Sequence, residues 1–146
     1  MQVIGFNFTK ISTEKSAEVI HPNITTNIEF TDVQKEKIDL LKDKEAAAIS
    51  FKYSLNYENT KGEKPSEDKS GEKSGEVLFE GKIVLSIEAE ESKNLQKAWK
   101  NKELPNSFKV PLFNLILKKC TPKAISLQDE LGLPFHIPMP KLERKD

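Results

Sequence analysis

The sequence predicts an α+β fold: a four-stranded antiparallel sheet with C-terminal helices packed on one of its faces. Three observations predict it. Apolar and polar residues alternate in four segments of the first 90 residues, which is the period of a half-buried strand. Beyond residue 90 the apolar spacing changes to three and four, the period of a helix. A chain of 146 residues can bury one sizeable core, so we expect a single domain over residues 1–146.

The alternating segments give the order of the expected strands. In chain order they span residues 2–11, 24–30, 47–57 and 77–89. The third and fourth are the clearest, because their alternation is the longest. Residues 32–45 permit two interpretations, a helical turn around Ile38 and Leu41 or an extension of the flanking strands into a long hairpin.

The connection between the third and fourth strands is highly polar. Residues 59–76 are rich in lysine, glutamate, serine and glycine and contain no large apolar side chain. Such a segment cannot bury enough apolar surface to become ordered, so the composition predicts a mobile loop. A charge run of this kind is usually a solvated surface segment, and we assign it no function.

A short amphipathic helix is expected after the fourth strand. In "SKNLQKAWKNKEL", residues 92–104, Leu95, Ala98 and Trp99 recur at helical spacing, and Ser92 is the expected N-cap. We expect this helix to cover the sheet, with Trp99 in the packing.

The following segment, "FKVPLFNLILKKC" (residues 108–120), predicts a helix with Pro111 in its first turn. Its apolar residues occupy nearly every side, so one sheet cannot cover them all. We expect a break at Thr121–Pro122. A further helix, with Ala124, Leu127 and Leu131 turned inward, then ends at Gly132.

The chain continues as "LGLPFHIPMPKLE", residues 131–143, in which prolines alternate with large apolar residues. Proline has no N–H to donate, so this stretch fits neither a helix nor a central strand and is expected to be extended. We expect residues 132–146 to form a proline-rich tail. It either packs on the body of the protein as a lid or is accessible for binding another molecule.

Composition excludes several classes of function. Lys plus Arg equals Asp plus Glu, at 23 each, so no net charge draws the chain to nucleic acid or anionic lipid. A single cysteine excludes an internal disulfide and a multi-cysteine zinc site. The amino-terminal "MQVIGFNF" lacks the pattern of a signal peptide, and no stretch has the length of a membrane span. We therefore expect a cytoplasmic protein that binds neither nucleic acid nor membrane.

No constellation of residues predicts catalysis. The two histidines, His21 and His136, have no metal-ligand spacing, and His136 is expected at the surface. Cys120 lies in an apolar helix and is expected to be a small core residue. No glycine-rich phosphate loop is present. The sequence thus predicts no enzyme, no cofactor and no metal site.

The order of elements resembles the SecB family of export chaperones along nearly the whole chain. In that family the main helix ends in a glycine-containing turn and enters a loop of the kind Phe-Pro-x-Leu-x-Leu-x-Pro, which covers a hydrophobic groove. Here "LGLPFHIPMP" is similar, with Leu133-Pro134, Ile137 and Pro140 in comparable places. The "LF" of Leu112-Phe113 ahead of an apolar helix is also similar.

The resemblance implies an ATP-independent holdase that binds unfolded or precursor polypeptides, with protein export as one setting, and that assembles with itself as a homotetramer, a dimer of dimers. The binding residues it implies are Leu112, Phe113, Ile116, Leu133, Phe135, Ile137 and Met139. The Cys- and His-bearing tail that binds zinc and helps to dock the SecA motor has no counterpart here, so docking of a motor stays open.

Three other functions stay open. One is a chaperone paired with a toxin–antitoxin system, and another is an oligomeric adaptor whose apolar residues are all interface. The third is a small domain that seals an apolar ligand in a cavity, either as a binding protein or as a hydrolase scaffold.

Overall fold

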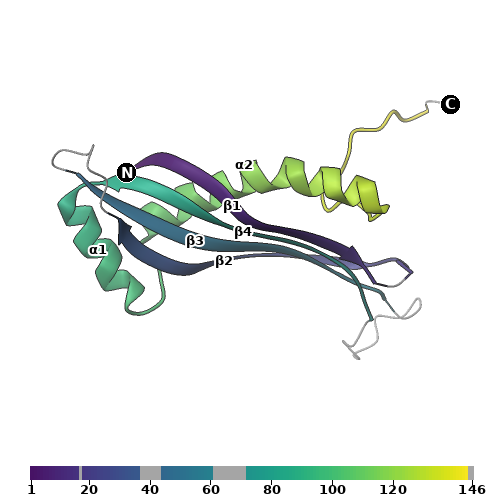
Figure 1. Ribbon diagram of the computed structural model, residues 1–146. Helices are drawn as coiled ribbons and strands as arrows, with labels where there is room; N and C mark the ends of the chain where they lie inside the picture. The colour runs from purple at the N-terminus through teal and green to yellow at the C-terminus, as the bar shows by residue number, and fades with distance from the viewer. Residues whose placement is uncertain (17, 37–43, 61–71, 145–146) are drawn as a thin grey trace.

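The computed structural model describes residues 1–16, 18–36, 44–60 and 72–144. Its elements follow the order β1 (Gln2–Lys15), β2 (Asn23–Glu36), β3 (Glu45–Glu58), β4 (Lys73–Ile87), α1 (Ala89–Trp99) and α2 (Asn106–Leu131). The strands form one antiparallel sheet in the order β1-β4-β3-β2, and α2 runs along one face of it (Figure 1). The predicted fold class is confirmed.

The strand register gives the sheet two unlike faces. The face toward the helices carries the core, and its largest fully buried side chains include Phe51, Tyr53, Tyr57 and Phe79. On the far face Lys10, Glu80, Lys52 and Glu29 lie directly opposite one another from strand to strand. Opposite charges in such pairs stabilise a sheet by roughly 0.2–1 kcal/mol each. The helices therefore cover the apolar face and leave the charged one uncovered.

α2 is one continuous helix, so the predicted break at Thr121–Pro122 is wrong. Pro111 also lies inside the helix rather than in its first turn. Both prolines are exposed, and the carbonyls they leave without a donor, on Ser107 and Lys118, belong to exposed residues that water can reach. Side chains at a spacing of four meanwhile stay on the sheet along the whole helix: Phe108, Leu112, Ile116, Cys120, Ala124 and Gln128. Burial of this inward row outweighs the local preference of proline.

α1 starts earlier than predicted. Its N-cap is Glu88, whose backbone N–H donates to the Glu91 carboxylate at 3.2 Å, as in a capping box. Ser92, the expected cap, lies inside the helix and is buried. The shift arises because β4 ends at Ile87 and the helix follows at once. Leu95 is fully buried, and Trp99 packs partly buried against the core.

The polar connection 59–76 is predicted too long at its C-terminal end. β4 begins at Lys73, and Ser74 and Gly75 are buried. Asn59 also holds the chain locally, since its side-chain amide donates to the Glu18 carbonyl at 2.6 Å. Residues 61–71, the greater part of the predicted loop, lie outside the described residues.

The ambiguous segment 32–45 extends the flanking strands, since β2 continues to Glu36 and β3 begins at Glu45. This agrees with the long-hairpin interpretation as far as the structure describes the segment. The alternative helical turn around Ile38 and Leu41 lies outside the described residues.

Candidate functional site

α2 has a row of side chains on each side of its buried inward row. At helical spacing, one row comprises Phe113, Leu117, Thr121 and Ile125, and the other comprises Leu115, Lys119, Lys123 and Leu127. The first row lies toward β2, because the Phe113 ring stacks on Phe30 at 5.0 Å. The second lies toward β1, because Lys123 stands 5.3 Å above the Phe8 ring. We call these two sides the β2 flank and the β1 flank.

The β2 flank is apolar and incompletely covered. On β2, Ile24, Ile28 and Phe30 are half-buried, and on α2 Leu117 is 40% exposed. The register sets Ile24 opposite Tyr57 and Ile28 opposite Tyr53. The apolar strip on β2 therefore continues directly into the buried tyrosines of β3.

The tail is fastened to the body at its first residues. Gly132 adopts a left-handed conformation (φ 68°) that ends α2, and the Leu133 N–H then donates to the Gln128 carbonyl at 2.8 Å. Leu133 is buried over Gly75, where a Cβ would lie only 3.0 Å from the leucine Cδ2. Leu133 is thus an anchor that belongs to the core, and the absence of a side chain at Gly75 makes room for it.

A partly buried polar cluster binds the next residues of the tail. The Tyr57 hydroxyl donates to the Pro134 carbonyl at 2.8 Å, and the Gln128 amide donates to the same hydroxyl at 2.6 Å. The Gln128 amide nitrogen also lies 3.0 Å from Nδ1 of His136, whose Nε2 lies 3.4 Å from the Tyr53 hydroxyl. His136 is half-buried and burial lowers its pKa, so the prediction of a surface histidine is wrong.

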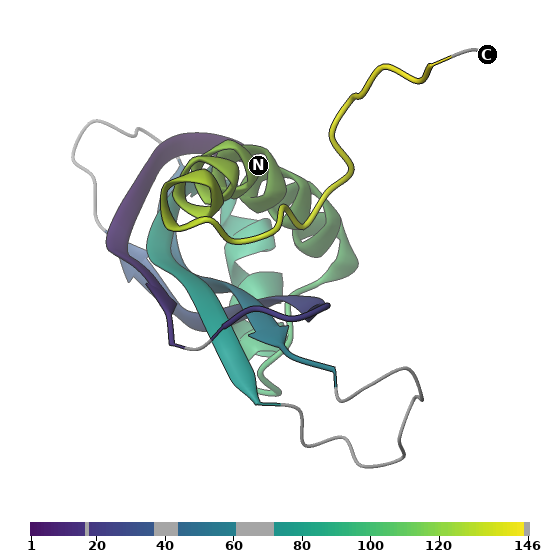
Figure 2. The same ribbon diagram turned by 90° about the vertical axis from the view of Figure 1, so that its right-hand side faces the viewer.

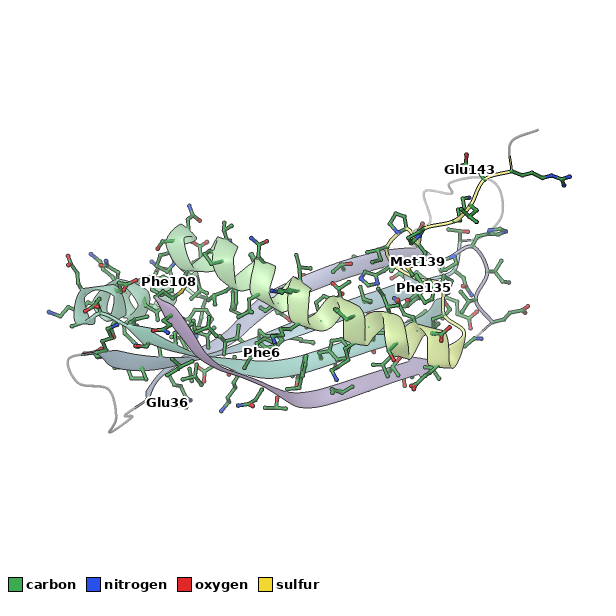
Figure 3. The ribbon with its side chains drawn as sticks, turned by 90° about the horizontal axis from the view of Figure 1, so that it is seen from above. Phe6, Glu36, Phe108, Phe135, Met139 and Glu143 are labelled. Carbon is green, nitrogen blue, oxygen red and sulfur yellow. The ribbon has the colours of Figure 1, made fainter. Side chains whose placement is uncertain are left out.

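On both sides of His136 the tail turns its apolar side chains outward. Phe135 is 38% exposed, Ile137 37% and Met139 47%. Figure 3 shows Phe135 and Met139 close together at the end of the molecule opposite Phe108. Pro134 and His136 contact Tyr57 and Tyr53, which the register sets opposite Ile24 and Ile28, so the tail begins at the level of these two β2 residues.

The structure separates the binding residues that the sequence suggested into two groups. Leu112, Ile116 and Leu133 are core residues in this conformation, at most 4% exposed. Phe113 is half-buried, whereas the three outward tail residues are accessible. Leu117, Tyr57 and Gln128 were not among the residues that the sequence suggested. The signal for Gln128 was present, since it is the polar member of an otherwise apolar row of period four.

The remaining candidates for a chemical role are Cys120 and any cluster of metal-binding side chains. Cys120 is fully buried in the inward row, and burial raises its pKa to about 12, so it is a neutral thiol packed in the core. Among the described residues, no three His, Cys, Asp or Glu side chains gather as a metal site would require. No helix in this part of the chain is long and apolar enough to cross a membrane.

Four antiparallel strands with α2 along one face and a proline-rich tail at its end define a SecB-like fold. The chain is similar to a solved structure of the SecB-like chaperone Rv1957 of Mycobacterium tuberculosis, in complex with a ChAD peptide from the Rv1956 HigA1 antitoxin. The TM-score is 0.52 at 10% identity, covering 99% of this chain and 92% of that one. At such low identity the likeness shows the fold. No family model and no curated protein matches the sequence.

Proposed function

We propose that this protein is an ATP-independent holdase chaperone that binds non-native polypeptides along the β2 flank and the tail. The observation that carries the proposal is the run of accessible apolar side chains on one side of α2. Leu117 follows Phe113, which stacks on Phe30 of β2, in the same row of α2, and the accessible residues Phe135, Ile137 and Met139 come after the end of this helix. Non-native chains expose apolar side chains, and a surface of this kind binds them without requiring one sequence.

The proposed binding surface comprises residues from three elements: Ile24, Ile28 and Phe30 of β2, Phe113 and Leu117 of α2, and Phe135, Ile137 and Met139 of the tail. Leu112, Ile116 and Leu133 support it from beneath as core residues. Holding requires only binding energy, so the proposal needs no nucleotide.

Two settings for this activity follow from what is known of similar proteins. The SecB resemblance favours precursor polypeptides on their way to export. The neighbouring structure holds a peptide from an antitoxin, which favours a chaperone paired with a toxin–antitoxin system. Both settings use the same surface and the same class of partner, an extended polypeptide. The choice between them depends on which natural client binds.

We further propose a cytoplasmic homotetramer, a dimer of dimers, as in the family that the sequence resembles. Exposed apolar side chains on β1 and at the start of α2 support self-assembly: Val3 at 41%, Ile4 at 44%, Ile11 at 48% and Val110 at 59%. Light scattering at micromolar concentration is expected to give four times the chain mass of 16.6 kDa. A folded monomer would contradict the assembly.

The holding activity is tested without nucleotide. A chemically denatured client is diluted into buffer with the protein at near-stoichiometric ratio, and aggregation is followed by turbidity. Suppression is expected. An adaptor would leave aggregation unchanged, and a protein that seals a small apolar ligand would bind a fatty acid but not the client.

A further inference from the structure

The far face of the sheet has an excess of acidic side chains, although the chain as a whole carries equal numbers of acidic and basic residues. Cross-strand partners point to the same face, so the register assigns each charged side chain of a strand to a face. Within the strands, Glu45 is the one acid on the helix side, and Lys35 lies 3.6 Å from it. The far face carries the remaining acids, among them Glu14, Glu29, Asp32, Glu36, Glu76 and Glu80. The lysines there are fewer: Lys10, Lys52, Lys73 and Lys82.

α2 carries the opposite sign on its solvent side. From Leu104 to Gln128 the chain contains four lysines and no aspartate or glutamate. All four are exposed: Lys109, Lys118, Lys119 and Lys123. In the part of the chain that the structure describes, no acid lies within ion-pair distance of any of them. Their charges are therefore not neutralised by neighbouring side chains and are available to a ligand.

Two of these lysines border the proposed binding surface. The ammonium group of Lys109 stands 5.9 Å from the centre of the Phe113 ring, which itself stacks on Phe30 of β2. Lys118 lies midway between Ile116 and Cys120 of the inward row, so its side chain points away from the sheet. It stands on the solvent side of the helical turn that presents Leu117. A ligand on the β2 flank therefore meets positive charge together with apolar side chains.

The other two lysines lie across the helix from that surface. Lys119 and Lys123 stand over Phe6 and Phe8 on the β1 flank. A helix with its side chains is about 10 Å wide, which exceeds the Debye length of about 8 Å at physiological salt, so their effect on the β2 flank is screened. At the end of α2 the charges are mixed: Asp129, Glu130, Lys141 and Glu143. The positive charge on the β2 flank is thus concentrated toward the start of α2.

The chemistry of this surface distinguishes two kinds of anionic ligand. Nucleic acid presents about one negative charge per 1.7 Å of duplex and is held through many phosphate contacts. Two lysines beside a phenylalanine and a leucine do not provide them, and the acids of the far face add repulsion. An extended polypeptide with apolar residues and a few carboxylates matches both the apolar side chains and the two ammonium groups.

We propose that the β2 flank selects apolar polypeptide segments that carry acidic residues, and that Lys109 and Lys118 pair with their carboxylates. The inference rests on the proposed function for the binding surface and specifies the class of client that this surface takes. An exposed charge pair contributes up to about fivefold to affinity, and a like-charged ligand is disfavoured in the same way. Two such positions are therefore expected to separate acidic from basic clients by about tenfold.

Three capped Gly-Ser peptides that differ only in charge test the selection. Each carries three leucines flanked on both sides by glutamates, by glutamines or by lysines, so that either chain direction brings the flanking residues to the start of α2. Their affinities are measured by fluorescence anisotropy at low and at high salt, because salt screens exposed charge pairs. A labelled oligothymidylate of the same length is the nucleic-acid probe.

Two double variants locate the effect on the helix. Lys109→Gln with Lys118→Gln removes the charges at the binding surface. Lys119→Gln with Lys123→Gln is the matched control, since it removes the same charge from the same helix on the β1 flank. A difference between the two variants then arises from the positions of the lysines and not from the net charge. Thermal unfolding and light scattering check that both variants are folded and assembled as the wild type is.

The wild type is expected to bind the glutamate peptide about tenfold more tightly than the lysine peptide, with the glutamine peptide between them. High salt is expected to reduce this preference. In the variant without Lys109 and Lys118 the preference is expected to shrink to within about twofold, whereas the control variant keeps it.

Each contrary result overturns a distinct part of the proposal. Equal binding of the three peptides would overturn the selection by charge while leaving the proposed function intact. Equal loss of preference in both double variants would overturn the assignment to Lys109 and Lys118. An oligothymidylate bound more tightly than the glutamate peptide would overturn the ligand class. No binding of any peptide would refute the proposed function, and the charge selection with it.

Discussion

The two flanks of α2 expose similar aromatic and aliphatic side chains but cover them in different ways. On the β1 flank the ammonium groups of Lys119 and Lys123 stand 6.0 and 5.3 Å above the rings of Phe6 and Phe8. Their charged ends stay in water while their stems cover apolar surface. On the β2 flank Phe113 stacks on Phe30, and the tail contacts Tyr53 and Tyr57 before it extends away from the body beyond the end of α2 (Figure 2). A lysine cover belongs to the helix itself, whereas a tail can be displaced without unfolding the helix.

The largest expected effect is a loss of client affinity when the apolar side chains of the tail are removed. Replacing Phe135, Ile137 and Met139 together with serine is expected to weaken the binding of unfolded polypeptide by tens-fold or more. Each apolar side chain lost from a bound contact costs on the order of 1 kcal/mol, less than for full burial because the three are already partly exposed. Affinity for a labelled, permanently unfolded chain measures the loss, and light scattering checks that assembly is unchanged. The matched control is Ile20→Ser, since Ile20 is exposed to a similar degree, at 49%, and is not part of the proposed binding surface.

Two results would count against this difference between the flanks. A triple variant that unfolds or loses its oligomeric state would show that the tail is part of the core. An intact variant that binds as strongly as the wild type would place the binding surface elsewhere.

An intermediate effect, on stability, is expected from Gly75→Ala, because Leu133 anchors the tail by packing on Gly75. A Cβ there would lie 3.0 Å from the Leu133 side chain and 3.2 Å from the Glu14 carbonyl oxygen, so both must give way. We expect the free energy of unfolding to fall by about 1–2 kcal/mol, within the range for overpacking, together with faster amide exchange in residues 133–136. Gly5→Ala is the control, because a Cβ at Gly5 meets Val84 at an ordinary 3.5 Å. Equal losses in the two variants would show that Gly75 has no special relation to the tail.

The smallest effect is expected on the β1 flank. Replacing Lys119 and Lys123 with glutamine removes two cation–π contacts and is expected to lower the free energy of unfolding by about 1–2 kcal/mol in total, at roughly 0.5–1 each. Client affinity is expected to stay within about twofold of the wild type. Denaturant titration and the same binding assay measure both quantities. A large loss of client binding would show that both flanks take part.

The environment of a residue could be predicted from the sequence where it depends on the spacing of neighbouring residues. It could not be predicted where it depends on partners far away in the chain. The strands and the inward row of α2 followed from spacing alone. The break expected at Pro122 did not form, because that expectation used local preference and the inward row continues past the proline. His136 was misplaced because its environment depends on Tyr53, 83 residues away. The outward position of Phe135, Ile137 and Met139 could be anticipated, since prolines keep their segment out of the sheet.

The opposite charges of Lys10, Glu80, Lys52 and Glu29 on the far face of the sheet help to set the pairing register of the strands. A strand that slips by one residue turns its apolar side chains to water, but a slip by two keeps them on the helix side, so the hydrophobic pattern does not reject it. The charges do. In the native register Lys52 and Lys10 both lie opposite Glu80, and a two-residue slip in one direction sets either of them opposite Lys82. Four side chains that touch neither helix nor tail can thereby discriminate among alignments of strands at least fourteen residues long.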